Sequence, residues 1–253
     1  MPFVLLVLAL IAQSATPPMP AFNAATAAVS APATLAQFDG GKLKGEPAGL
    51  AWSADGAQFY LRTAEYDRWR NERAHHYVVA AAGGAPTPVL EAPAWALAYW
   101  AWKSGFVAPG SPDLRLETDV QQRIATAVGS VSDGGLSQSR ADPNRSQVES
   151  DMASAQKVNT ITVTFKGQLL MKLENEALLP GVRYGWAPAG VSALAYSDGK
   201  RRLVLVDRAG RTLEVPGATD VLLPAWSPDG TRVAYLQKNK KKYSLNVVTV
   251  GAR

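Results

Sequence analysis

The residues that could carry acid–base or nucleophilic chemistry are few in this chain. His75 and His76 are the two histidines among its 253 residues, and they are adjacent. Neighbouring residues of a strand point to opposite faces, so we expect one histidine to pack and the other to be solvated. Asp67 and Glu72 lie nearby, but their spacing matches no metal site. We therefore expect no bound metal.

The nucleophiles and phosphate-binding motifs of common enzymes are missing from the sequence. The chain has no cysteine, no serine in a Gly-x-Ser-x-Gly elbow and no glycine-rich phosphate loop with a lysine. A repeated fold could bring Asp55, Asp198 and Asp229 to one face as paired carboxylates, and the alternative is that all three are turn residues. We expect no catalytic residue and no cofactor, so the sequence favours a protein that is not an enzyme.

One polar segment has the composition of a binding surface. Residues 65–73 show no strand alternation and include Tyr66, Arg68, Trp69 and Arg70. Exposed Tyr, Trp and Arg are enriched at binding hot spots, so we expect a contact loop here. The alternative is that Trp69 folds back over the edge of a sheet.

A second candidate surface is a run of lysines. The net charge is +5, and the basic residues are diffuse apart from Lys238 and the run Lys240, Lys241 and Lys242. This run is typical of a solvated hairpin tip, and the alternative is a site for an acidic partner such as an anionic envelope polymer. Nucleic acid is not expected, because no basic stripe is interleaved with aromatic residues elsewhere.

The N-terminal residues predict export. Phe3–Ala12 is an uninterrupted apolar run too short to span a bilayer, and Ala12-Gln13-Ser14 fits a cleavage site. No basic residue precedes the run, and an apolar N-terminal strand is the alternative. We expect a signal peptide over residues 1–14 and a disordered Ala/Pro/Thr/Ser-rich spacer over 15–32. No later run is long enough to span a membrane, so we expect a periplasmic or secreted protein that is not membrane-spanning.

A repeated hairpin organises the rest of the chain. Its clearest copy, Leu223–Leu236, consists of two alternating strands joined by Ser227-Pro228-Asp229-Gly230. In such a turn proline presets φ and glycine takes the positive φ. A second copy is Leu50–Leu61, and Tyr184–Tyr196 is a weaker third. We expect the tryptophan of each copy to lie in the core between neighbouring sheets.

Further elements are predicted from alternation and turn residues. The aromatic stretch Trp95–Trp102 is interpreted as a buried part of a strand unit. Residues 113–128 alternate as a hairpin, and the alternative is a helix. Residues 129–157 are expected to be a loop with a short amphipathic helix over 144–157. The remaining strands are expected at 34–38 and 42–43 around a glycine turn, 76–79 and 89–90, 160–165 and 168–173, 203–206 and 212–215, and 243–250.

The spacing of these elements indicates a repeat. Gly41 and Gly84 lie 43 residues apart, as do Gly167 and Gly210. A period of roughly 40–45 residues with four strands per unit is typical of propeller blades. We therefore predict an all-β, β-propeller-like array of about five four-stranded units, one of them incomplete, with a short helical insertion. The N-terminal strand could complete the last unit, and an open array is the alternative to a closed ring.

The repeated residues resemble a known family. Trp226-Ser-Pro-Asp-Gly, followed by a strand ending in Ala234-Tyr235, resembles the TolB-type propeller repeat, which is also found in prolyl-oligopeptidase-like propellers. The run from Trp52 to Gly56 matches with one change, and the run from Trp186 to Gly190 lacks the aspartate. Tyr77–Gly84 resembles the third strand and Gly-Gly turn of that repeat. The resemblance implies a TolB-like domain over residues 33–253, although the separate α/β domain of TolB is missing here.

The resemblance indicates the fold but does not specify the function, since propellers host many activities. We expect an exported, non-catalytic scaffold that binds a protein or an envelope polymer. One alternative is a remnant or accessory subunit of a prolyl-oligopeptidase-like hydrolase, whose catalytic domain is absent from this sequence. Another is a small-molecule or sugar binder that uses the aromatic cluster Trp95–Trp102.

Overall fold

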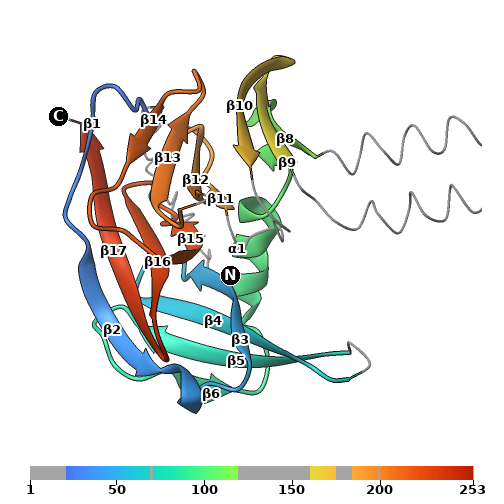
Figure 1. Cartoon of the computed structure of the whole chain (residues 1–253), viewed down its shortest axis with the longest axis vertical. Helices are drawn as coiled ribbons and strands as arrows, with labels where there is room; N and C mark the ends of the chain where they lie inside the picture. Colours follow the sequence, from blue (N-terminus) through green and yellow to red (C-terminus); the bar gives the residue numbers. More distant parts are fainter. Residues whose placement is uncertain (1–20, 69–70, 119–159, 175–183, 199, 253) are drawn as a thin grey trace, which may run out of the picture.

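The described part of the chain is mostly β-structure, in four antiparallel sheets and one α-helix (Figure 1). The computed structural model describes residues 21–68, 71–118, 160–174, 184–198 and 200–252. Sheets I to III each contain four strands that follow one another in the chain, and sheet IV contains five. The sheets are compatible with blade-like units, as the repeat predicts.

The strands of the four sheets have the following bounds. Sheet I contains β3 (Glu46–Trp52), β4 (Gln58–Tyr66), β5 (Glu72–Ala80) and β6 (Thr87–Val89). Sheet II contains β7 (Val107–Ala108), β8 (Ser111–Thr118), β9 (Thr160–Phe165) and β10 (Gln168–Glu174). Sheet III contains β11 (Tyr184–Trp186), β12 (Ala193–Ser197), β13 (Leu203–Asp207) and β14 (Thr212–Glu214). Sheet IV contains β15 (Val221–Trp226), β16 (Arg232–Asn239), β17 (Lys242–Ala252), β1 (Ala27–Val29) and β2 (Ala33–Asp39).

Local turn chemistry explains the repeated hairpins. Asp55 accepts hydrogen bonds from Ser53 Oγ at 2.5 Å and from the Ala57 amide at 3.0 Å, and Gly56 has a φ of 68°. Asp229 makes the equivalent bonds in sheet IV, from the Ser227 hydroxyl and from the amide of the residue after the turn glycine. Asp198 accepts from two amides in its own turn. All three aspartates are therefore turn residues, so the alternative to paired carboxylates is confirmed.

One tryptophan from each repeated hairpin fills each interface between sheets. Trp52 lies in the core between sheets I and IV, Trp226 between sheets IV and III, and Trp186 between sheets III and II. All three side chains are at most 1% exposed, which confirms the prediction that they are core residues. Because a buried indole removes a large apolar area from water, these three interfaces bind the sheets into one array, in the order II, III, IV, I.

The N-terminal residues differ from the expected spacer and hairpin. Residues 21–32 belong to the fold: Phe22 is buried against Trp226, and β1 pairs with the end of β17. β2 pairs with β17 and not with residues 42–43, because Gly40–Lys42 forms a 3-10 turn that directs the chain to sheet I. β17 is eleven residues long, so its outer edge accommodates both N-terminal strands. The N-terminal strands therefore complete the last sheet.

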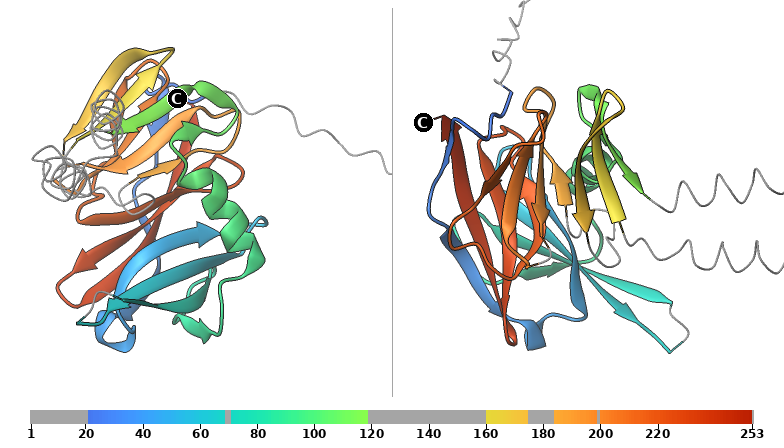
Figure 2. Two further views of the ribbon diagram at one scale, coloured as in Figure 1. Left: turned by 90° about the vertical axis from the view of Figure 1, so that its right-hand side faces the viewer. Right: turned by 45° about the horizontal axis from the view of Figure 1, so that its top comes forward.

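The aromatic stretch that was expected to form strands is the helix α1, Ala94–Lys103. Trp95–Trp102 alternates aromatic and small residues, but Ala96, Tyr99 and Lys103 also recur at helical spacing, and these three are the buried positions. Alanine is the strongest helix former, and this helix contains four alanines. The views agree that α1 lies between sheets I and II, the two ends of the array formed by the described sheets (Figures 1 and 2). No helix in the described residues has the length and apolar character needed to cross a membrane.

The helix packs its aromatic residues inwards. Tyr99 donates a hydrogen bond to the Trp226 carbonyl at 2.5 Å, and Trp100 Nε1 donates to the Leu50 carbonyl at 3.2 Å. The Trp102 and Tyr99 rings contact each other edge to face. These rings hold α1 against the inner strands, so they are used for packing, which weakens the case for a sugar site on this cluster.

Sheet II merges two of the units that the sequence suggested. Residues 113–118 belong to β8, so the helix alternative for this part is wrong, and β8 pairs directly with β9. The expected strand 124–128 and the insertion 129–157 lie outside the described residues. Since β7–β8 and β9–β10 share one sheet, the described residues form four sheets where about five units were expected. The other strands expected at 160–165, 168–173, 203–206, 212–215 and 243–250 are confirmed.

Candidate functional site

The most unusual surface feature is the end of the β4–β5 hairpin. β4 and β5 stay paired as far as Tyr66 and Glu72, whereas β3 accompanies β4 only to Ala64. We call residues 65–68 and 71–73 the arm. It projects away from sheet I as a two-stranded ribbon (Figures 1 and 2). The expected irregular loop therefore begins and ends in strand, at 65–66 and 72–73, and these strand ends show no apolar alternation because their side chains are exposed on both faces.

Polar side chains tie the two strands of the arm together. Arg62 forms an ion pair with Glu72, and the Tyr66 hydroxyl donates to Glu72 at 3.2 Å. At the turn, Asp67 accepts hydrogen bonds from the Asn71 amide at 2.8 Å and from its side-chain nitrogen at 2.9 Å. A two-stranded ribbon is marginally stable in water by itself, so these cross-strand contacts are what define the arm.

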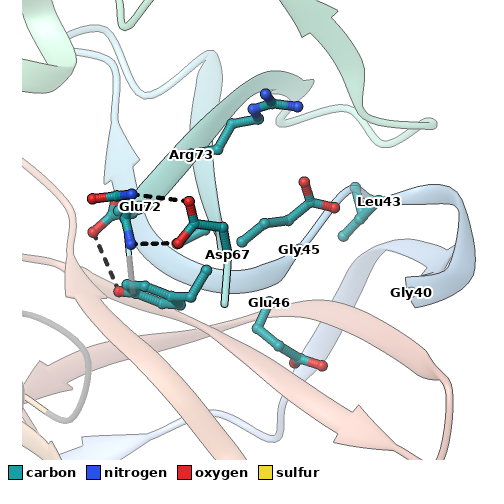
Figure 3. Close-up of a pocket in the computed structure, with 11 residues that line it drawn as sticks. Gly40, Leu43, Gly45, Glu46, Asp67, Glu72 and Arg73 are labelled. Atoms are coloured by element: carbon teal, nitrogen blue, oxygen red, sulfur yellow. Dashed lines mark hydrogen bonds between the residues drawn. The ribbon is translucent and has the colours of Figure 1, made fainter. Parts of the chain in front are cut away.

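A hollow of about 1050 Å³ lies beside the base of the arm (Figure 3). One wall is the segment from Gly40 to Glu46 that leads into β3, and the other is formed by residues 64–67 and 71–73. Figure 3 shows Asp67 and Glu72 on one side of the hollow and Leu43 and Gly40 on the other. Among the described residues, the lining contains the carboxylates of Glu46, Glu65, Asp67 and Glu72 and one basic side chain, Arg73.

Two of the predicted contact residues are placed by the structure. Tyr66 is 62% exposed although it is a large aromatic residue, and Arg68 is also exposed on the arm. Trp69 and Arg70 lie outside the described residues. Tyr66 contributes to the lining of the hollow, so the arm and the hollow form one continuous surface.

The predicted basic tip lies next to this surface. Lys240, Lys241 and Lys242 are exposed where β16 turns into β17, as expected for a solvated hairpin tip. The Gly40 amide donates to the Lys241 carbonyl at 2.7 Å, which fixes the wall of the hollow to the tip. The structure thus brings together two regions that are about 170 residues apart in the chain.

Glu46 joins the hollow to the basic tip. Its carboxylate accepts hydrogen bonds from the Tyr243 hydroxyl at 2.7 Å and from Lys238 Nζ at 3.3 Å. The bond from Tyr243 and then the ammonium of Lys238 lower the pKa of Glu46, against the opposing effect of partial burial. The group therefore keeps its negative charge at neutral pH.

The two histidines point to opposite faces of β5, but neither is simply packed or solvated. His76 Nδ1 is 2.5 Å from the Tyr60 hydroxyl, and His75 Nε2 is 3.0 Å from a Glu65 oxygen. Both rings are half-buried. Burial, followed by the nearby Arg62 and His75 charges, lowers the pKa of His76. Within the described ranges, no group of three or more His, Asp or Glu residues could hold a metal ion.

Sequence reasoning missed a buried lysine at the centre of the array. Lys103 ends α1, has no exposed surface, and donates from Nζ to the Leu50 carbonyl at 3.3 Å. Burial lowers the pKa of its amine to about 7. The sequence feature that could have indicated it is a single basic residue at the end of an otherwise uncharged aromatic stretch. Interpreting this stretch as a strand gave no reason to expect that residue to be buried.

Comparison with the models of known protein families finds no match to this chain, and no curated protein matches it.

Proposed function

We propose that this protein is an exported, non-catalytic scaffold of the TolB-like β-propeller type, which binds a protein or an envelope polymer in the periplasm or outside the cell. The repeated Trp-Ser-x-Asp-Gly hairpins, the four antiparallel sheets and the tryptophan at each interface support the propeller assignment. The apolar run at residues 3–12 supports export.

The arm is the observation that carries the binding role. A ribbon that leaves its sheet gains no burial for the fold, yet this one is held in shape by several polar contacts. It presents an aromatic side chain that is 62% exposed, and aromatic residues and arginine are enriched at binding hot spots. The hollow and the basic tip extend the same surface, so a partner could contact all three.

In-cell crosslinking of the tagged mature protein, followed by mass spectrometry, tests this proposal. We compare the wild type with the double variant Tyr66→Ala/Arg68→Ala. The matched control is Arg208→Ala, an exposed arginine at a turn of sheet III. We expect the double variant to lose most of the captured partner and the control to keep it, with unchanged melting temperatures. Equal capture by all three proteins would contradict the proposal, and a captured hydrolase would favour the accessory-subunit alternative.

A further inference from the structure

β5 has an open edge where it enters the arm. β4 covers one side of β5 along its whole length, whereas β6 covers the other side only at His76, Tyr77 and Val78. Within the described part of the chain, no strand pairs with the outer side of Glu72–His75.

The hydrogen-bond pattern shows which main-chain groups face this edge. Bonded and non-bonded pairs alternate along an antiparallel ladder. The Asp67 amide donates to the Asn71 carbonyl at 3.1 Å, which makes them a bonded pair. The alternation then turns the amides and carbonyls of Glu72 and Ala74 outwards. Two donors and two acceptors therefore face outwards along this edge, in line with the groups of His76 and Val78 that meet β6.

A fully exposed leucine lies at the head of the same edge. Val89, the last residue of β6, is opposite His76, so Leu90 follows beside the point where the open edge begins. The side chain of Leu90 is completely exposed. An added strand that continued the line of β6 would place one of its own side chains against Leu90. An apolar side chain at that position would pack on Leu90.

The charges on the edge make it selective. Exposed strand edges are templates for pairing, and proteins protect them with charged residues. Glu72 and Arg73 both lie on this one, so indiscriminate pairing with other chains is disfavoured. A strand that carries charges opposite to those of Glu72 and Arg73 can still pair with this edge.

We propose that the partner binds the arm by adding one extended strand to β5 along Glu72–His75, in line with β6 and against Leu90. This inference rests on the proposed binding function and names how the partner is held. Main-chain hydrogen bonds to Glu72 and Ala74 supply affinity, and the flanking side chains supply specificity, as in other cases of strand addition.

The test uses Ala74→Pro in the full mature chain. Proline at this position removes one outward amide and blocks an incoming strand, but removes no bond to β4, because an outward amide is the place where an edge strand tolerates proline. Ala74→Val keeps the amide and is the matched control. Leu90→Lys removes the apolar contact without changing the main chain. It therefore tests strand addition even if the proline variant does not fold.

The probe is a library of random linear twelve-residue peptides displayed on phage and selected on the wild-type protein. We expect selected peptides to protect the amides of Glu72 and Ala74 from hydrogen exchange. Binding should fall about tenfold or more in Ala74→Pro and Leu90→Lys, since the former loses a hydrogen bond and the latter an apolar contact, and should be unchanged in Ala74→Val.

Three outcomes would overturn strand addition: no selectable peptide, binding by Ala74→Pro and Leu90→Lys that equals binding by the wild type, or exchange protection away from β5. The capture experiment with Tyr66→Ala/Arg68→Ala decides the binding function separately. A partner that depends on Tyr66 but is indifferent to Ala74→Pro would leave the scaffold function standing and remove the strand-addition mechanism.

Discussion

The β15–β16 hairpin and the arm are two hairpin ends that are stabilised in opposite ways. At the first, Trp226 is fully buried between two sheets and the turn is closed by Asp229. At the second, Tyr66 is exposed and the strands are tied by one ion pair and by hydrogen bonds at the surface. Burial of apolar area contributes several kcal/mol per aromatic residue, whereas exposed polar pairs contribute ~0–1 kcal/mol each. The sheets therefore carry stability, and we propose that the arm carries recognition.

Replacing the buried tryptophan tests this division most severely. We expect Trp226→Ala to lower the free energy of unfolding by about 3–5 kcal/mol, because it opens a cavity between sheets III and IV. Tyr66→Ala should change it by less than about 0.5 kcal/mol. Urea denaturation of both variants measures the difference. Similar losses would mean that the arm is part of the stabilising core.

The buried lysine gives a second test, through pH. Its pKa is about 7 in the fold against 10.5 for a free lysine, so the unfolded state binds more protons between these values. The contribution of Lys103 to stability therefore rises as the pH increases from 7 to 10.5, and its full cost is present below pH 7. We expect Lys103→Met to raise the free energy of unfolding by about 1–4 kcal/mol at pH 6. The gain should shrink towards pH 10, as followed by urea denaturation, and a gain that did not change with pH would refute this role.

The repeated tryptophans allow a finer comparison. Trp52 Nε1 donates to the Ala225 carbonyl at 3.0 Å, and Trp186 Nε1 donates to the Gly105 carbonyl at 2.6 Å. Trp226 Nε1 has no hydrogen-bond partner among the described residues. We expect Trp52→Phe to cost about 1 kcal/mol more than Trp226→Phe, because only the first leaves a carbonyl without its donor. Equal losses in chemical denaturation would show that the Trp52 bond adds nothing beyond packing.

The smallest effect is expected within the arm. Glu72→Gln weakens the ion pair with Arg62 and the bond from Tyr66, at a cost of ~0–1 kcal/mol in global stability. Local opening should increase, so amides of residues 65–68 and 71–73 should exchange faster while those of β15 and β16 do not. Arg208→Ala serves as the control. Unchanged exchange in the arm would mean that other contacts hold it.

The sequence predicted the repeated hairpins because their turns are local. Ser227, Asp229 and Gly230 specify one turn within four residues, and the same chemistry recurs in sheet I. The helix α1 was missed because its aromatic stretch combines a partial alternation with alanine, typical of a strand, with the helical spacing of Ala96, Tyr99 and Lys103. The pairing of β8 with β9 was missed because it joins Thr118 to Ile161 across a long segment, a contact that no local pattern specifies.

The candidate site was predicted only in pieces. Tyr66, Arg68 and the lysine tip were selected by residue type, which indicates surface chemistry but gives no spatial relation. The hollow depends on the 3-10 turn Gly40–Lys42 and on the contact of Glu46 with Tyr243, which bring together distant parts of the chain. A hairpin end whose strands are held together by polar cross-strand pairs in solvent has no apolar alternation, so its sequence pattern is typical of a loop.

The most direct test of the division between scaffold and arm is site-specific photocrosslinking in cells. A photoreactive residue is placed at position 66 in one protein and at position 208 in another, and the adducts are identified by mass spectrometry. The account predicts one dominant adduct from position 66 and none above background from position 208. Equal labelling from both positions, or a specific adduct from position 208 alone, would contradict it.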